Sequence, residues 1–264
     1  MKLCLGTVQL GCGTYGINRN VEDQHTALNM YRAARDCGVE YFDCSFEYGD
    51  SLERLLYAIG KTGSYSEPKL IVKLNPNDGV RQVEVMQWFR DGHDCRCLMS
   101  HGPTGASFKD LWGRWCERLG CSVYSPQEAQ AVSEWADVVQ LPYNVLDQRL
   151  KDYPDINYEP MLRSIFLQGL LLMKDIPPWA DRYVAPVQRK AAEYGISTME
   201  LCLWFVESTF PNTLVSFGAD SPRQIEEVAE VAKKAEKKVH ELGFPYFAYG
   251  LQCDELRVID PRFW

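Results

Sequence analysis

Four polar residues, Asp43, Tyr48, Lys73 and His101, are of types that could together deliver a proton to a substrate oxygen. A free tyrosine phenol has a pKa of about 10, so it is a weak acid at neutral pH. A neighbouring lysine ammonium would favour the tyrosinate and lower that pKa, and a carboxylate would keep the lysine charged. A histidine beside them could orient a carbonyl oxygen by hydrogen bonding. We interpret the set as candidate machinery for general acid catalysis.

Each of these residues also has an ordinary explanation when it is taken alone. A tyrosine after a strand is most often a half-buried packing residue, and a strand-end lysine or aspartate is most often solvated or in a structural ion pair. Their order along the chain favours chemistry. Asp43 and Tyr48 belong to the second expected strand and the loop after it, Lys73 to the third strand, and His101 follows the fourth.

Short β-rich runs alternate with longer segments of helical period, which is typical of βα units and a parallel sheet. The expected strands are Lys2–Leu10, Glu40–Ser45, Lys69–Leu74, Cys95–Ser100, Cys121–Tyr124, Val138–Pro142, Met161–Leu167 and Thr213–Phe217. Eight alternations over 264 residues predict an α/β fold, a closed (β/α)8 TIM barrel with surrounding helices. The length suits a single domain over residues 1–264.

The segments between the strands carry helix patterns and helix stop signals. The expected helices are Gln24–Cys37, Ser51–Lys61, Gly79–Asp91, Phe108–Leu119, Pro126–Ala136, a pair within Trp179–Phe210, and Pro222–Glu241. Gly38 and Gly120 follow two of them and could take the left-handed cap conformation. Residues 144–160 are polar and contain two prolines, so we expect an irregular connection with at most a short helical turn. The aromatic tail, residues 243–264, is expected to pack across a barrel end.

In such a barrel the carboxyl ends of the strands meet at one mouth, where active sites lie. Because three consecutive strands supply them, Asp43, Tyr48, Lys73 and His101 are expected to converge there. This common location makes the set far more specific than any of its members.

Composition narrows the possible partners and the cellular location. A formal net charge of -8 argues against a nucleic-acid partner, because binding a phosphate backbone requires a basic face. No run reaches the roughly 18 apolar residues that a membrane span needs. The first residues, MKLCLGTVQLG, are too short and interrupted for a secretory h-region, so a cytoplasmic protein is expected.

The ten cysteines are interpreted as free thiols rather than disulfides or metal ligands. Most stand inside apolar segments, where free cysteine packs as a small hydrophobic residue, and no export signal accompanies them. There is no CxxC pair, and Cys95 and Cys97 lack further ligand residues nearby in the sequence. No metal site is therefore expected.

Several segments occur in an order and context that are more specific than any single motif. They are Leu5-Gly6-Thr7, Phe42-Asp43, Tyr48-Gly49, Lys73, His101, Ser122–Ser125, Val139–Asn144 and Arg163–Gly169. In these segments the chain resembles the aldo-keto reductase family, and the similarity covers nearly its whole length. The resemblance implies Tyr48 as general acid, Lys73 and Asp43 as the pair that tunes it, and His101 as the group that orients the carbonyl.

The resemblance also implies NADPH or NADH as cofactor, bound extended across the barrel mouth. Gln140 would bind the nicotinamide carboxamide, Arg163 stands where the family often has a stacking aromatic, and residues 218–221 would meet the adenosine end. The implied cofactor-binding residues are Gly6, Thr7, Ser122, Gln140, Arg163, Ser164, Gly169, Gly218, Asp220, Ser221, Gln224 and Glu227.

Some positions depart from the family pattern. Gly218 and Gln224 stand where Lys and Arg often bind the 2'-phosphate of NADPH, and Asp220 would repel that phosphate if it points inward. Charge-assisted hydrogen bonds contribute roughly 1.5 to 3 kcal/mol, so the departures are large enough to change the preferred cofactor. The choice between NADPH and NADH stays open. Val123 and Leu52 depart from the frequent Asn and Glu, and neither removes the four-residue set.

The expected activity is reduction of a small-molecule aldehyde or ketone, with a sugar or nucleotide-sugar carbonyl as one candidate substrate. One alternative is redox-neutral elimination or epimerisation with a tightly bound nicotinamide. Another is a binding module that senses nicotinamide redox state, although a sensor has no need of a tuned proton donor. The pattern leaves the substrate and the oligomeric state undetermined.

Overall fold

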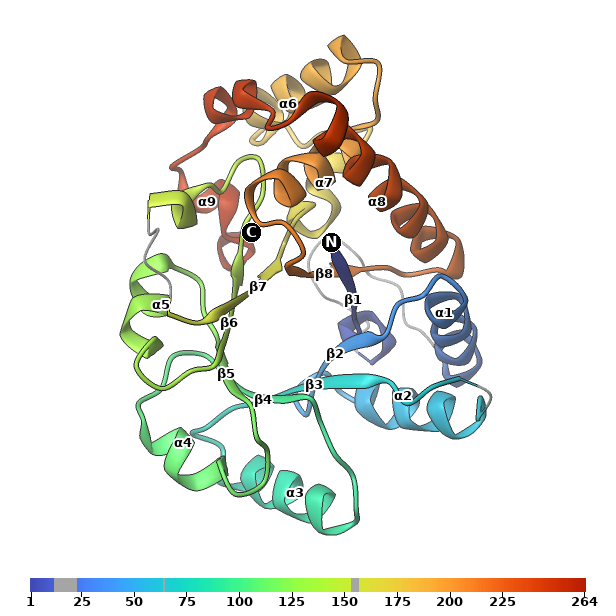
Figure 1. The fold of residues 1–264 in the computed structure, drawn as a ribbon, viewed down its shortest axis with the longest axis vertical. Helices are drawn as coiled ribbons and strands as arrows, with labels where there is room; N and C mark the ends of the chain where they lie inside the picture. Colours follow the sequence, from blue (N-terminus) through green and yellow to red (C-terminus); the bar gives the residue numbers. More distant parts are fainter. Residues whose placement is uncertain (12–22, 64, 153–156) are drawn as a thin grey trace.

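The fold is a closed barrel of eight parallel strands in sequential order, with β8 pairing to β1 (Figure 1). It was obtained as a computed structural model, which describes residues 1–11, 23–63, 65–152 and 157–264. The strands are β1 (Lys2–Gly6), β2 (Tyr41–Ser45), β3 (Lys69–Leu74), β4 (Cys97–His101), β5 (Leu119–Ser122), β6 (Val138–Pro142), β7 (Glu159–Arg163) and β8 (Leu214–Gly218). The predicted (β/α)8 barrel is confirmed.

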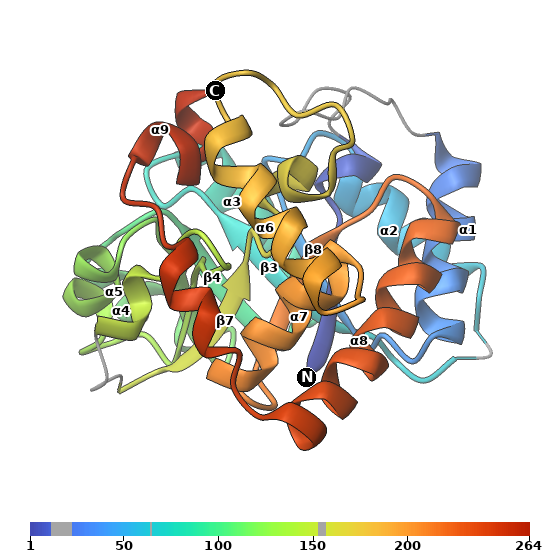
Figure 2. The same cartoon turned by 90° about the horizontal axis from the view of Figure 1, so that it is seen from above.

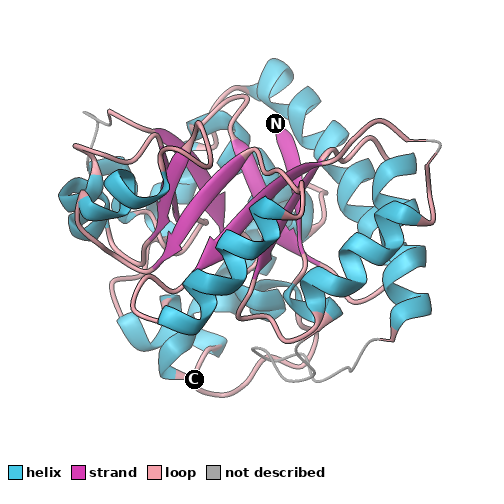
Figure 3. Ribbon diagram, turned by 90° about the horizontal axis from the view of Figure 1, so that it is seen from below, coloured by secondary structure: helices cyan, strands magenta, loops and turns pink. Residues whose placement is uncertain are grey.

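Helices surround the barrel, and the ribbon coloured by secondary structure shows this layer outside the strands (Figure 3). They are α1 (Gln24–Asp36), α2 (Ser51–Gly60), α3 (Gly79–Arg90), α4 (Ser107–Trp112), α5 (Pro126–Val132), α6 (Asp181–Glu193), α7 (Thr198–Thr209), α8 (Pro222–Leu242) and α9 (Leu256–Ile259). Short 3-10 helices occupy Val8–Leu10, Arg149–Asp152, Leu167–Leu172, Tyr246–Leu251 and Pro261–Phe263. Among the helices in these described ranges, none combines the length and apolar content needed to cross a membrane.

Local signals explain several helix ends. The Asp23 side chain accepts a hydrogen bond from Thr26 N at the start of α1, and Gly38 follows its end at φ +83°. At α5 the Ser125 and Glu128 side chains each accept a hydrogen bond from the other residue's backbone N–H, which forms a capping box. These ends were recognisable because their signals lie within a few residues of each other.

The fourth helix differs from its prediction. The sequence favours a helix over Phe108–Leu119 with Gly120 as its stop, and this is wrong, because α4 ends at Trp112 and Leu119 begins β5. Leu119 is drawn into the sheet by pairing with Leu98 on β4. Gly120 is a strand residue, and a side chain there would clash with Val138 O, 2.6 Å from the Cβ position.

β5 ends at Ser122, two residues earlier than predicted, and two other strands each end four residues early. β1 ends at Gly6 rather than Leu10, because the chain turns into a 3-10 helix at Val8. β7 ends at Arg163 rather than Leu167, because Ser164 adopts a positive φ of 58° and breaks the extended conformation. The expected irregular connection before β7 contains only one short 3-10 helix within its described part.

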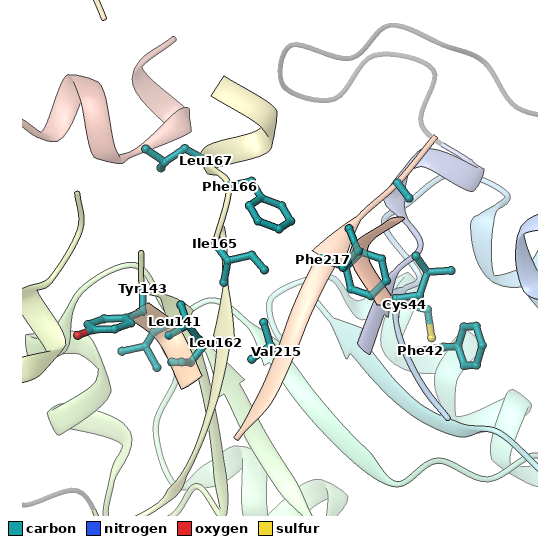
Figure 4. Close-up of a cluster of buried hydrophobic side chains, with 14 of the residues drawn as sticks. Phe42, Cys44, Leu141, Tyr143, Leu162, Ile165, Phe166, Leu167, Val215 and Phe217 are labelled. Atoms are coloured by element: carbon teal, nitrogen blue, oxygen red, sulfur yellow. The ribbon is translucent and has the colours of Figure 1, made fainter. Parts of the chain in front are cut away.

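The side chains of the barrel divide into two cores. Cys4, Ile71, Cys97, Met99, Val138, Met161 and Leu214 form a cluster of their own, contributed by strands from around the barrel. The larger core lies between strands and helices, and Figure 4 shows part of it, including Phe42, Val215 and Phe217. Successive strand residues face opposite sides of a sheet, and β1, β3, β4, β6, β7 and β8 each contribute to both cores.

The two termini lie at opposite ends of the molecule, the N-terminus at the end where β1 begins (Figure 2). The tail packs on the connection after β6, where Gln148 Nε2 donates to Ala248 O at 2.6 Å. Its last turn reaches the barrel mouth, where the Arg262 guanidinium lies 3.6 Å from the centroid of the Tyr124 ring. The expectation that the tail packs at a barrel end is met by this last turn.

Candidate active site

A buried ion pair lies at the centre of the site. The Lys73 ammonium on β3 is 2.8 Å from an Asp43 carboxylate oxygen on β2, and the two residues are only 2% and 4% exposed. Gln140 on β6 bridges them, because its Oε1 accepts from Lys73 at 3.1 Å and its Nε2 donates to Asp43 at 2.8 Å. The Ser216 hydroxyl on β8 donates to the same carboxylate at 3.2 Å. Four strands thus converge on one carboxylate.

This environment keeps Lys73 charged. Burial alone would lower its pKa, but the Asp43 carboxylate and a hydrogen bond with Tyr48 raise it by more, so the net shift of the Lys73 pKa is upward. A buried charge of this kind is tolerated only when it is paired and hydrogen-bonded. The lysine therefore presents a permanent positive charge at neutral pH.

Tyr48 is held above this pair by the loop between β2 and α2. Its backbone N–H donates to Ser45 O, and its carbonyl accepts from Ser51 N, which folds the loop into a tight turn. Gly49 has φ +59°, and a Cβ there would lie 2.7 Å from Gly11 O, so only glycine fits. The Lys73 ammonium lies 5.2 Å from the centroid of the Tyr48 ring.

His101 ends β4 and lies beside the tyrosine. The two rings meet edge to face with centroids 5.8 Å apart. Its Nδ1 is hydrogen-bonded to a carboxylate oxygen of Glu47, in the same loop as Tyr48. Burial, followed by the charge of Lys73, lowers the pKa of His101 below its ordinary value, while the Glu47 carboxylate opposes this shift. The imidazole is therefore mainly neutral at neutral pH.

A cavity of about 630 Å³ opens over this centre and extends to the start of α8. Most of the residues expected at the site line it: Gly6, Asp43, Tyr48, Lys73, Arg163, Ser164, Gly169, Gly218, Asp220, Gln224 and Glu227. These residues come from both ends of the chain, so the structure brings together what the sequence placed far apart.

The other expected residues lie next to the cavity without lining it. His101 is one of them. The Thr7 hydroxyl donates to Asp43 O and fixes the end of β2. The Ser122 hydroxyl donates to Gln140 Oε1, and Ser221 caps α8 by accepting from Gln224 N.

Gln140 has no hydrogen-bonding capacity left for a ligand in this structure. Its Oε1 accepts from both Lys73 and Ser122, and its Nε2 donates to Asp43 and to the sulfur of Met161. The residue is fully buried. Its amide supports the ion pair here, and binding of a nicotinamide carboxamide by Gln140 stays a prediction.

Arg163 lines the cavity and is fixed by the chain around it. It donates to Val123 O at 2.8 Å and to the Ser164 hydroxyl at 3.3 Å. Its guanidinium also lies 4.2 Å from the centroid of the Tyr124 ring. The guanidinium thus lies over a protein aromatic ring in this structure.

Sequence analysis overlooked some polar groups of the site. Gln9 and Gln168 line the cavity, and each has a buried side-chain oxygen without a hydrogen-bond partner among the described residues. Ser216 was detectable, since it is a polar residue in the middle of an otherwise apolar strand. Glu47 was not among the expected site residues, and nothing local in the sequence connects it to His101.

Neither a metal-binding cluster in the described part of the chain nor a sequence match helps to identify the site. Within the described ranges, no group of three or more His, Cys, Asp or Glu side chains is arranged to hold a metal ion. No family model and no curated protein matches the chain in sequence.

Solved structures do match. A glycerol dehydrogenase from Gluconobacter oxydans aligns with a TM-score of 0.66 and 17% identity over 92% of this chain and 93% of that one. The holo form of an aldo-keto reductase from Bacillus halodurans aligns with a TM-score of 0.69 and 16% identity over 91% of each chain. At this level of identity the likeness shows that this chain shares the barrel fold of these two proteins.

Proposed function

We propose that residues 1–264 form one catalytic domain of the aldo-keto reductase type, which reduces an aldehyde or ketone to an alcohol with NADPH or NADH. The observation that carries the proposal is the buried Asp43–Lys73 ion pair next to Tyr48, at the inner end of a cavity at the carboxyl ends of the strands. Active sites of (β/α)8 barrels lie at this end. The shared fold with a glycerol dehydrogenase and an aldo-keto reductase is consistent with this chemistry.

In the proposed reaction Tyr48 donates a proton to the substrate oxygen. The charged Lys73 beside it stabilises the phenolate that is left behind, and Asp43 holds the ammonium in place. Gln140 and Ser216 keep the Asp43 carboxylate oriented while the proton moves. When bound, the nicotinamide supplies the hydride to the carbonyl carbon.

The cavity fits a long ligand with hydrogen-bond donors. It runs from Tyr48 at one end to Glu227 on α8 at the other. Buried oxygens without a partner are costly. The side-chain oxygens of Gln9 and Gln168, which have no hydrogen-bond partner within the described part of the chain, could accept hydrogen bonds from the carboxamide or ribose hydroxyls of a dinucleotide. These residues would hold the cofactor together with Arg163 and the loop that follows it.

The charges lining the cavity favour NADH over NADPH. Near the start of α8 the described lining residues include the carboxylates of Asp220 and Glu227. The basic residues among the described lining residues are Lys73 and Arg163, and neither belongs to α8. A 2'-phosphate at the α8 end would meet negative charge, and a ribose diol would not.

The proposal is tested with Tyr48→Phe, which removes the acidic proton and keeps the ring. Turnover of a panel of aldehydes and ketones, sugars included, should fall by roughly 10² to 10⁴-fold. Nucleotide affinity, measured by tryptophan fluorescence, should stay unchanged. Tyr41→Phe is the matched control, because it makes the same chemical change at the start of β2, the strand that leads into the loop of Tyr48. Unchanged turnover of Tyr48→Phe, or binding of neither NADPH nor NADH by the unmodified protein, would refute the proposal.

A further inference from the structure

Neither proton donation by Tyr48 nor the Asp43–Lys73 ion pair explains the contact between Glu47 and His101. Glu47 lies in the β2–α2 loop and His101 at the end of β4, 54 residues later, and the two side chains meet at Nδ1. The side chains are 28% and 24% exposed, so the pair lies partly buried at the mouth. Surface ion pairs contribute little to stability on average, which directs attention to what this contact does to the histidine.

The structure fixes the backbone of Glu47. Its N–H donates to the Ser45 hydroxyl at 3.1 Å, and that hydroxyl donates to Lys73 O at 3.1 Å. Ser45 is fully buried. The carboxylate is therefore presented from a turn that is anchored to the end of β3, next to the lysine of the site.

The contact determines which ring nitrogen carries the proton. A carboxylate can only accept, so a hydrogen bond to Glu47 requires the proton on Nδ1 of His101. In the neutral imidazole Nε2 then carries a lone pair and accepts hydrogen bonds. The contact with Glu47 engages Nδ1 alone. Nε2 becomes a donor to a carbonyl only when the ring gains a second proton.

The charged groups around the ring act in opposite directions. Lys73 disfavours the second proton, while Glu47 and Asp43 favour it. The facing strand β5 places the uncharged Ser122 beside His101. Glu47 is the carboxylate in direct contact, so its removal has the more direct effect on the ring.

We propose that Glu47 is a positioning residue for His101, which holds the proton on Nδ1 and so reserves Nε2 for the substrate oxygen. The proposal deepens the carbonyl reductase function and rests on it for the identity of the substrate group. Its consequence is that Nε2 accepts from a substrate hydroxyl when the ring is neutral and donates to a carbonyl when the ring is protonated.

The direct test is ¹⁵N NMR of the histidine rings, which reports the protonated nitrogen and needs no substrate. The chain has four histidines, and His101→Gln assigns the signals of His101. The unmodified protein should show a neutral ring with its proton on Nδ1. In Glu47→Ala this preference should be lost. In Glu47→Gln an acceptor oxygen remains but the charge is gone, so the ring should titrate at lower pH.

Glu84→Gln is the matched control. Glu84 carries the same charge on α3 and pairs with Arg81, which also senses the charge of Glu47. This variant should leave the His101 tautomer and titration unchanged. If the proton resides on Nε2 in the unmodified protein, or if Glu47→Ala leaves the tautomer unchanged, the proposal is overturned whatever the enzyme does.

A second experiment, the pH dependence of the reaction rate, depends on the proposed function. The rate of carbonyl reduction should rise as the pH falls through the titration of His101, and Glu47→Gln should move this rise to lower pH. If the Glu47 variants change the tautomer of His101 but leave the pH profile of carbonyl reduction unchanged, the proposed role of Glu47 toward the substrate is overturned. Failure of the reductase proposal itself would appear differently, as unchanged turnover in Tyr48→Phe.

Discussion

Replacing Lys73 by Met tests how the buried ion pair contributes to folding. Methionine fills a similar volume but leaves the Asp43 carboxylate, 4% exposed, without a cation. Gln140 and Ser216 still donate to that carboxylate, so it is not wholly unsatisfied. Breaking a buried pair by removing one partner costs about 3 to 5 kcal/mol. Because two donors remain, we expect a loss near the lower end, about 3 kcal/mol, near pH 8.

The pH dependence gives this prediction its sign. In the unmodified protein the folded-state pKa of Lys73 is raised, so its contribution is fully present below the ordinary lysine pKa and is lost only at strongly alkaline pH. In the variant the buried Asp43 carboxylate has no cation beside it, and burial disfavours the charged form of a carboxyl group. The stability of the variant should therefore be higher at acid pH, where carboxyl groups take up protons, than at alkaline pH. The loss should be smaller near pH 5 than near pH 8.

The assay is denaturant unfolding followed by tryptophan fluorescence near pH 5 and pH 8. Lys73→Met with Asp43→Asn is the companion variant, because it removes both charges and leaves no unpaired ion. The double variant should be more stable than Lys73→Met alone near pH 8. Its loss of stability relative to the unmodified protein should be nearly the same at both pH values. A loss below about 1 kcal/mol for Lys73→Met, or an equal loss at both pH values, would refute the reasoning.

Two further predictions concern the loop of Tyr48 and the cofactor preference. Gly49→Ala should cost at least about 1 kcal/mol in unfolding free energy, because its φ of +59° strains an L-residue and its Cβ would clash with Gly11 O. Gly63→Ala, where a Cβ meets nothing within 4 Å, should change stability by less than about 0.5 kcal/mol, and equal effects of the two would contradict the argument. Asp220→Asn should strengthen NADPH binding relative to NADH by roughly threefold to tenfold in fluorescence titrations, since it removes a negative charge from the cavity lining. Glu226→Gln on exposed α8 surface should leave the ratio unchanged, and an unchanged ratio in Asp220→Asn would remove Asp220 from the cofactor site.

Sequence patterns that span only a few residues predicted most of the fold. β3 and β6 have the bounds that their apolar runs predict, because a buried parallel strand needs such a run whatever surrounds it. The start of α1 at Gln24 follows from a capping residue three positions from its partner. The prediction for the α4 region was wrong because a contact distant in the sequence decided its structure. Its helical period continues past Trp112, and only pairing with β4 draws Leu119 into the sheet.

Some residues of the candidate site were likewise identified from local sequence, and others only from tertiary contacts. Asp43, Tyr48 and Lys73 were identified because their residue types and strand-end positions are visible locally, and the structure brings them together. Glu47 was missed, since its partner His101 is 54 residues away. The structure shows the amide of Gln140 engaged by the ion pair, and its expected role in binding the cofactor stays a prediction.

The sequence by itself determined the alternation of strands and helices, the order of the strands and the strand ends that carry polar side chains. These properties follow from periodicity and from turn and cap chemistry, which act over a few residues. Only the tertiary structure decided which polar groups became partners. Closure of β8 on β1 places Ser216 against Asp43, 173 residues away in the chain. Inside a closed barrel every inward polar atom must find its partner across the interior, and no local pattern records that choice.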